Sequence, residues 1–322
     1  MSASIEDSIA TAAELLSAAT SIAFLGHVGP DGDALGTIMG LAGAARAAGK
    51  DAVASFPVPF VLPRTLSFLD EEFLVAPDSL PPTIDLVVSC DVAAPERLAN
   101  LLPYARKAPN LIVLDHHKSN TGFGDVDVID PHAASTAQIA FRMIEKLEWE
   151  LDQRSATALY TGILTDTGRF QYSMTTPDVH RIAASLLEHG VEPDAVGQAV
   201  YEQTSFGYLG VAGAVMSRAV FDEENRFVWS VLYRADLEAA SIERQDAEGL
   251  IDLIRTTVGA DVACLLKEVG ENETKGSLRS RGATDVATLA ELFGGGGHHN
   301  AAGFLARMTP AEVIAEITRH LE

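Results

Sequence analysis

The chain has 322 residues, of which 47% are hydrophobic and 21% charged, a composition typical of a soluble globular protein with about two domains. The formal net charge of −22 argues against wrapping long DNA or RNA, because such binding depends on many Lys and Arg contacts to phosphate. No apolar run reaches the roughly 18 residues of a membrane span, and no signal-peptide pattern opens the chain, so we expect a cytoplasmic protein. Cys90 and Cys264 lie in apolar surroundings and are interpreted as core residues.

Strands and helices alternate through the first part of the chain. Apolar runs of strand length are followed by segments with helical spacing, which predicts an α/β fold whose mainly parallel sheet is flanked by helices. The expected strands cover 22–27, 51–56, 84–90 and 111–114, and the expected helices cover 3–19, 34–48, 134–149, 152–164 and 177–189.

The second part of the chain predicts a smaller α/β domain with a mixed sheet. Helical and turn signals mix over 191–215, which we interpret as a linker between a catalytic domain of residues 1–190 and a second domain of residues 216–322. The expected strands of the second domain cover 227–232, 261–268 and 276–281, and its expected helices cover 284–292 and 309–321.

Acidic and histidine side chains follow three of the predicted strands where each strand ends. The first strand ends at His27 and leads into the turn Pro30-Asp31-Gly32-Asp33, the third leads into Asp91, and the fourth leads into Asp115-His116-His117. The functional crevice of a parallel sheet lies outside these strand ends. Because Asp and His together suit divalent metals such as Mn, Zn or Fe, the sequence predicts a metal site there.

Each acidic cluster also has a simpler interpretation. Asp31 and Asp33 would serve equally well as caps of the helix that follows them. An aspartate after a strand, such as Asp91, is often a turn residue, and Asp166 could belong to a local turn. Asp115-His116-His117 is harder to explain by packing, although a hydrogen-bonded cluster is possible. Taken together, the four clusters favour a dinuclear metal site over four independent caps.

The order of these residues resembles the four motifs of the DHH phosphoesterase superfamily. The motifs are His27-x-x-Pro30-Asp31-x-Asp33, Asp91, Asp115-His116-His117 and Asp166. In the second domain, Gly294-Gly-Gly-Gly297-His298 followed by Ala301-Ala-Gly303 resembles the glycine-rich signature of the associated DHHA1 domain. The resemblance covers almost the whole chain. It is greatest for the branch of oligoribonuclease (nanoRNase) and pAp phosphatase enzymes, which includes relatives that degrade cyclic di-AMP.

The resemblance implies two divalent metal ions, usually Mn²⁺, with one residue shared between them. The first ion would be held by His27, Asp31 and Asp91, and the second by Asp33, Asp91, His116 and Asp166.

The resemblance further implies in-line attack on phosphorus by a hydroxide that the two metals activate. Three residues would have catalytic roles. Asp91 would bridge the metals, and Asp115 would orient the ring of His116. His117 would contact the phosphate or assist the leaving oxygen.

The second domain supplies the expected substrate contacts. Arg279 and Arg281 are two residues apart, so on a strand they would share a face, and arginine suits bidentate contact with phosphate. The glycine run lets backbone N–H groups approach an anion closely. The expected substrate-binding residues are Arg279, Arg281, Gly295, Gly296, Gly297 and His298.

The leading interpretation is therefore a metal-dependent phosphoesterase that hydrolyses short nucleotide phosphates to mononucleotides. The resemblance implies RNA oligomers of a few residues, pAp, and linear or cyclic di-AMP as substrates, and a homodimer as the assembly. Neither long nucleic acid nor a membrane is expected as a partner. Two alternatives stay open, a manganese-dependent inorganic pyrophosphatase of the same superfamily and a non-catalytic nucleotide-binding module.

Overall fold

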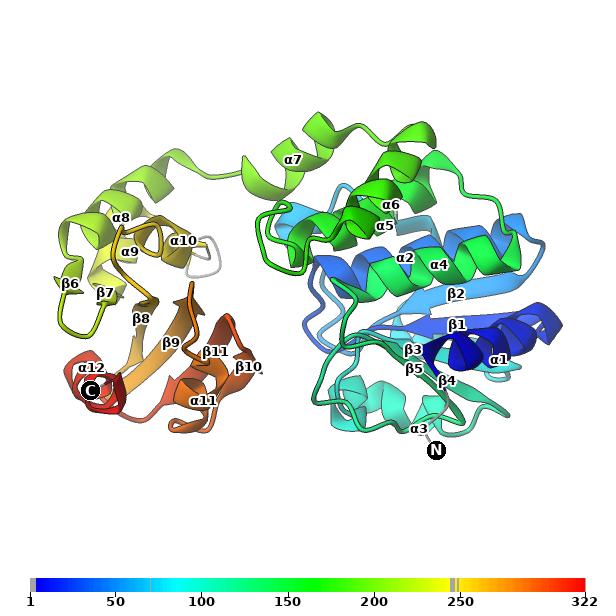
Figure 1. The fold of residues 1–322 in the computed structure, drawn as a ribbon, viewed down its shortest axis with the longest axis horizontal. Coiled ribbons are helices and arrows are strands. Elements are labelled where there is room, and N and C mark those ends of the chain that lie inside the picture. The colour runs from blue at the N-terminus through cyan, green and yellow to red at the C-terminus, as the bar shows by residue number, and fades with distance from the viewer. Residues whose placement is uncertain (1–3, 70, 244–246, 248, 322) are drawn as a thin grey trace. The chain divides into compact units, whose positions relative to one another are not determined.

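A five-stranded parallel sheet forms the centre of the first of two units, Met1–Gln203, in the computed structural model of the chain (Figure 1). The structure describes residues 4–69, 71–243, 247 and 249–321. The strand order is β2-β1-β3-β4-β5, and every neighbouring pair is parallel, which confirms the expected fold class. The strands are β1 (Ser21–Leu25), β2 (Asp51–Ser55), β3 (Leu86–Cys90), β4 (Leu111–Asp115) and β5 (Val126–Ile129).

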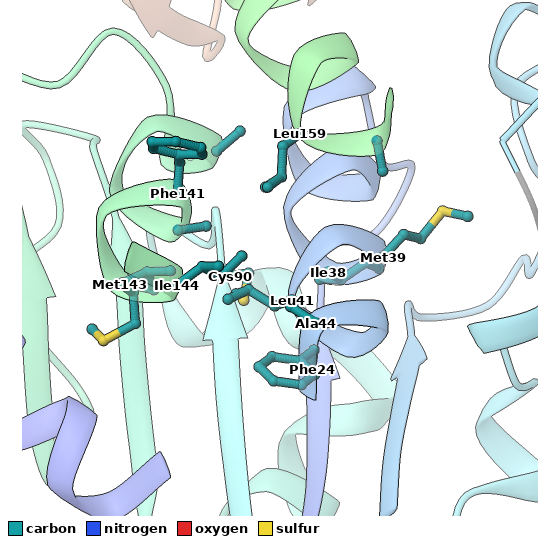
Figure 2. Close-up of a cluster of buried hydrophobic side chains, with 14 of the residues drawn as sticks. Phe24, Ile38, Met39, Leu41, Ala44, Cys90, Phe141, Met143, Ile144 and Leu159 are labelled. Carbon is teal, nitrogen blue, oxygen red and sulfur yellow. The ribbon is translucent and has the colours of Figure 1, made fainter. Parts of the chain in front are cut away.

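Helices cover both faces of this sheet because its central strands β1, β3 and β4 bury both of their faces. Phe24 and Val88 point into a large core under the long helices, part of which Figure 2 shows, whereas Leu25 and Val87 point into a smaller core on the other face. The larger core is covered by α1 (Ile5–Ala18), α2 (Gly32–Ala47), α4 (Thr136–Leu147), α5 (Gln153–Asp166), α6 (Pro177–Glu188) and α7 (Pro193–Tyr201). The smaller core is covered by η4 (Pro95–Leu101) and α3 (Leu102–Ala105).

Helices α2 and α5 pack closely because α2 presents glycine where the two meet. A Cβ atom at Gly36 would collide with the backbone of Ala158, and one at Gly40 would press against the Leu159 side chain. At the start of α2, a Cβ at Gly32 would collide with Thr165. The close approach brings the beginning of α2 beside the end of α5, which carries Asp166.

The sheet changes winding direction at β1, which pairs with β2 on one side and with β3 on the other. In an open α/β sheet, ligands bind outside the carboxyl ends of the strands at such a point. The chain leaves β1 toward His27 and leaves β3 at Asp91, so both motifs lie where the topology predicts a site.

The second unit, Thr204–Glu322, contains a six-stranded sheet of order β10-β11-β9-β8-β7-β6. Only β7 and β8 pair in parallel, so the sheet is mixed, as expected. The strands are β6 (Val220–Asp222), β7 (Phe227–Leu232), β8 (Val262–Gly270), β9 (Glu273–Ser280), β10 (Gly296–His298) and β11 (Ala301–Ala306). The helices are α8 (Phe206–Ser217), α9 (Arg234–Ala240), α10 (Leu250–Ile254), α11 (Val286–Glu291) and α12 (Pro310–Leu321).

Several short elements have no counterpart in the sequence-based prediction. Strands β5, β6 and β10 have only three or four residues each, too few for an alternating pattern to stand out. The segment 191–215, expected as a linker, carries α7 and most of α8. Over the described residues, no helix combines the length and the apolar character that crossing a membrane would require.

Candidate metal centre

Carboxylate and imidazole groups converge beyond the ends of β1, β3 and β4. Within the described residues, three sets of side chains each bring their possible ligand atoms within 4.8 Å of one another. The structure thus brings together all six residues that the sequence analysis proposed as metal ligands, and it adds His117 to them. The sets are His27, Asp31 and Asp91; Asp33, His116 and Asp166; and Asp91, His116 and His117.

His27 and Asp31 come from the turn between β1 and α2. The Nε2 atom of His27 lies 3.7 Å from Oδ2 of Asp31 and 3.7 Å from Oδ2 of Asp91. The other oxygen of Asp31, Oδ1, accepts the backbone N–H groups of Asp33 and Ala34 and so caps α2. The capping and ligand interpretations of Asp31 are therefore compatible, because each uses a different oxygen.

His116 faces a second group of carboxylates. Its Nε2 atom lies 3.2 Å from Oδ2 of Asp166, 3.7 Å from Oδ1 of Asp91 and 4.0 Å from Oδ2 of Asp33. The two oxygens of Asp91 therefore face different histidines, with Oδ2 toward His27 and Oδ1 toward His116. A carboxylate in this position is suited to bridge two cations.

The backbone of Asp91 adopts an unusual conformation. Its φ of 60° lies in the left-handed region, which few residues other than glycine occupy, although Asp tolerates it better than most. The Asp91 N–H donates to the carbonyl oxygen of Leu114, which ties the residue to the end of β4. Strained backbone of this kind is concentrated at functional sites, where the surrounding structure holds it in place.

The electrostatics of the cluster favour a bound cation. Burial, and then repulsion from neighbouring carboxylates, raises the pKa of Asp91 and of Asp166 well above the usual range. Burial likewise raises the pKa of Asp33. A cation between these groups would remove the repulsion and stabilise their ionised forms. The donor set of imidazole nitrogens and carboxylate oxygens fits Mn²⁺, Zn²⁺ or Fe²⁺.

The N-terminus of α4 holds two of the aspartates, a feature that the sequence analysis missed. The backbone N–H of Thr136 donates to Oδ2 of Asp33 at 2.6 Å, and that of Ala137 donates to Oδ1 at 2.9 Å. The Thr136 hydroxyl donates to Oδ1 of Asp91 at 2.9 Å. The available signal was the pair Ser135-Thr136 at the start of a predicted helix, where polar side chains and unpaired N–H groups are expected.

The Asp115 carboxylate orients His117, which corrects the expectation that it orients the ring of His116. Oδ1 of Asp115 accepts from Nδ1 of His117 at 2.7 Å, and Oδ2 accepts from the Asn120 amide at 2.7 Å. Oδ1 also accepts the backbone N–H of His116, but the Nδ1 atom of that ring lies 3.3 Å from the carbonyl oxygen of Ala133. The ring of His116 contacts Ala133 and the ring of His117 contacts Asp115, because the side chains of consecutive residues project in different directions.

The ionisation of His117 follows from this contact. Burial acts to lower the pKa of His117, but the hydrogen bond to Asp115 and the carboxylate charges outweigh it, so the pKa is raised. A protonated imidazole held by a carboxylate is a suitable proton donor.

The expected substrate residues of the second unit lie around β9, β10 and β11. Arg279 stands near the end of β9, where its Nη1 donates to the carbonyl oxygen of Leu278, and its buried Nε has no hydrogen-bond partner among the described residues. Arg281 follows the strand and is exposed. Gly296 and Gly297 belong to β10, Gly295 precedes it, and the side chain of His298 lies outside the part of the chain that is described.

Gly297 is a position of this run where glycine is required. The φ of Gly297 is 150°, and a Cβ atom there would press against the backbone of Ala301 and Ala302 on β11. The β10–β11 hairpin therefore depends on the absence of a side chain at Gly297.

Comparison with known proteins places both units in known families. Residues 21–163 match the DHH family, N-terminal domain, and residues 225–322 match the DHHA1 domain. The chain is 37% identical to the bifunctional oligoribonuclease and PAP phosphatase NrnA of Thermus thermophilus over 86% of this chain and 81% of that protein. It is 24% identical to the cyclic-di-AMP phosphodiesterase GdpP of Bacillus subtilis over 96% of this chain but only 48% of that protein.

Among solved structures, an exopolyphosphatase-related protein from Bacteroides fragilis has the same fold over nearly the whole chain. The TM-score is 0.88, the identity is 25%, and the match covers 98% of this chain and 96% of the other. The two family matches and the 37% identity agree with the order of the acidic motifs along the chain. The chain therefore belongs to the DHH family of phosphoesterases, with a DHHA1 domain as its second unit.

Proposed function

We propose that this phosphoesterase hydrolyses short nucleotide phosphates to mononucleotides. The observation that carries the proposal is the position of Asp91 in the acidic cluster, where one carboxylate oxygen faces His27 and the other faces His116. The relative at 37% identity is named as an oligoribonuclease and PAP phosphatase, which supports RNA oligomers of a few residues and pAp as substrates. The likeness to a cyclic-di-AMP phosphodiesterase supports linear and cyclic di-AMP as further candidates.

Two divalent cations, most suitably Mn²⁺, are the proposed cofactors. His27, Asp31 and Asp91 would hold one, and Asp33, Asp91, His116 and Asp166 would hold the other. Bound cations of this kind supply water activation near neutral pH and stabilise charge on the phosphoryl oxygens.

The side chains around the cations have separate tasks in this proposal. Ala133 accepts from Nδ1 of His116, which leaves Nε2 of that ring for the cluster. Asp115 accepts from Nδ1 of His117 and holds the ring in one orientation. We assign to His117 the donation of a proton to the leaving oxygen, because its raised pKa keeps the ring protonated closer to neutral pH.

The DHHA1 unit is proposed to bind the part of the substrate away from the reacting phosphate. Arg279 has a buried Nε without a partner among the described residues, and an N–H left in this state costs free energy that a bound anion would recover. Arg281, Gly295, Gly296, Gly297 and His298 complete the proposed set. A homodimer stays a prediction from the family resemblance.

The test is a substrate comparison with purified full-length protein. The protein is incubated with Mn²⁺ and, separately, with pAp, the dinucleotide pApA, cyclic di-AMP and pyrophosphate, and the products are separated by chromatography. We expect AMP from at least one nucleotide substrate, and we expect a chelator to stop its release.

Two results would contradict the proposal. Cleavage of pyrophosphate alone would identify the chain as an inorganic pyrophosphatase. Binding of nucleotides without turnover of any substrate would identify a non-catalytic module. The variant Asp91→Asn serves as the control for contaminating phosphatases, because it should lose the activity of the wild-type protein.

A further inference from the structure

Arg97 lies beside the metal centre, outside the set of residues that the sequence analysis and the family motifs single out. It belongs to η4, six residues after Asp91, and its Nη2 atom lies 2.8 Å from Nδ1 of His27. The backbone around it is fixed to the same turn, because the N–H of Val28 donates to the carbonyl oxygen of Arg97 at 2.9 Å. The residue as a whole is exposed, and its contact with His27 is partly buried.

The Nδ1 atom of His27 has two neighbours, of which one is a hydrogen-bond donor and the other an acceptor. The Arg97 guanidinium has only donors, so its contact is a hydrogen bond only when Nδ1 carries a lone pair. The carbonyl oxygen of Val28, 3.0 Å from the same Nδ1, is an acceptor, so that contact is a hydrogen bond only when Nδ1 carries a proton. A neutral imidazole has one N–H, and its position decides which neighbour is bonded.

If His27 is a metal ligand, that role determines which of its ring nitrogens carries the proton. Its Nε2 faces Asp31 and Asp91, so Nε2 must offer its lone pair if the ring is to hold a cation there. The ring proton is then on Nδ1 and donates to Val28. Nδ1 can no longer accept from Arg97, and the guanidinium is released while its backbone stays beside the cluster.

We propose that Arg97 is a phosphate-binding residue of the DHH unit, and that its guanidinium is available to the substrate when His27 serves as a metal ligand. The guanidinium fork matches two oxygens of a phosphate group, and a cation at this edge offsets the charge of an anion that must approach several carboxylates. The inference rests on the proposed function, because a phosphoesterase must hold a phosphate at its metal centre.

The test measures phosphate binding and metal binding separately, without turnover. Inorganic phosphate is titrated into the Mn²⁺-loaded full-length protein by calorimetry, for the wild type, Arg97→Ala and Arg97→Lys. Arg106→Ala is the matched control, because Arg106 is an exposed arginine at the end of α3 in the same unit. In parallel, Mn²⁺ is titrated into each metal-free protein.

We expect Arg97→Ala to weaken phosphate binding by about tenfold or more, the effect of losing a charge-assisted hydrogen bond. Arg97→Lys should recover part of the loss, since lysine keeps the charge but not the fork. Arg106→Ala should match the wild type. Mn²⁺ affinity of Arg97→Ala should be unchanged or higher, because the competitor for Nδ1 of His27 has been removed.

Unchanged phosphate affinity in Arg97→Ala would overturn the inference. A loss of Mn²⁺ affinity in that variant would also overturn it, because Arg97 would then be a support for the His27 ring. Failure of the proposed function is a different result. In that case the wild type cleaves no nucleotide substrate, while the dependence of phosphate binding on Arg97 can still be measured.

Discussion

The hydroxyl of Thr136 donates a hydrogen bond of 2.9 Å to the carboxylate of Asp91 and so joins the N-terminus of α4 to the residue that follows β3. The backbone N–H groups of Thr136 and Ala137 donate hydrogen bonds to the carboxylate of Asp33. The N-terminus of α4 thus positions two carboxylates, one from the first turn of α2 and one from the end of β3. Hydrogen-bond partners of this kind orient metal ligands.

Replacement of Thr136 by valine should weaken the metal centre. Thr136→Val keeps the shape of the side chain and its backbone N–H but removes the donor to Asp91. Because such supporting contacts contribute about 10- to 100-fold to metal affinity or activity, we expect Mn²⁺ affinity to fall by at least about tenfold. Calorimetric titration of Mn²⁺ into the metal-free protein measures the change. Thr136→Ser retains the hydroxyl and is the control, and equal affinities in the two variants would contradict the positioning role.

Asp91→Asn should abolish turnover and change how the stability of the metal-free protein depends on pH. Asn is chosen because, like Asp, it tolerates the left-handed conformation at this position. Burial and neighbouring carboxylates raise the folded-state pKa of Asp91 above its unfolded value of 3.8. The folded state therefore favours the protonated carboxyl of Asp91. Its contribution to the free energy of unfolding is complete below about pH 4 and is lost as the pH rises through the folded-state pKa.

Thermal unfolding of the chelator-treated proteins between about pH 4 and pH 8 checks this expectation. The wild type should lose stability relative to Asp91→Asn as the pH rises, because only the wild type must ionise a carboxyl at this position. A difference in Tm between the two proteins that stays constant with pH would show that Asp91 is not held in its protonated form.

His117→Ala should separate metal binding from catalysis. The ring contacts Asp115 through Nδ1, and its raised pKa suits a proton donor, so we expect bound Mn²⁺ to be retained and kcat to fall by about 10²- to 10⁴-fold. Metal content of the dialysed protein and steady-state rates measure the two effects. The ligand atoms of His117, Asp91 and His116 lie within 4.8 Å of one another, so a loss of metal in this variant would identify His117 as a ligand.

Gly36→Ala should destabilise the first unit and weaken metal binding together. The added methyl group would collide with the backbone of Ala158, and such overpacking costs about 1–3 kcal/mol. Pushing α5 away from α2 would also move Asp166 away from Asp33. Gly197→Ala on α7 is the matched control, since open space surrounds its Cβ position and alanine favours a helix by about 0.5–1 kcal/mol. Chemical denaturation should therefore show lower stability for Gly36→Ala and higher stability for Gly197→Ala. Titration of Mn²⁺ should show lower metal affinity in Gly36→Ala alone.

Arg279→Ala should raise KM more than it lowers kcat. The residue lies on β9 of the DHHA1 unit and is proposed to contact the substrate away from the reacting phosphorus, so its contribution is to binding. Steady-state kinetics on the best substrate from the comparison above measure both constants. Arg307→Ala, at an exposed arginine after β11, is the control. A fall in kcat with unchanged KM would assign Arg279 to the transition state instead.

The sequence by itself determined the fold class and predicted six of the residues that gather in the candidate metal centre. Long periodic helices and buried parallel strands have strong local signals, and the chain places its Asp and His residues at strand ends, which meet at one edge of a parallel sheet. Short elements such as β10 were missed because three residues show no period. Both interpretations of Asp31 were available from its position before α2, and the structure shows that they are compatible, because one oxygen caps α2 while the other faces His27.

Only the tertiary structure decided which partners orient these side chains. The contact from Thr136 to Asp91 joins residues 45 positions apart, and that from Arg97 to His27 joins residues 70 apart. Asp115 is adjacent to His116 in sequence, yet its carboxylate holds the ring of His117. Such contacts depend on how helices and turns pack on the sheet, since side-chain direction and hydrogen-bond partners follow from three-dimensional placement and not from spacing along the chain.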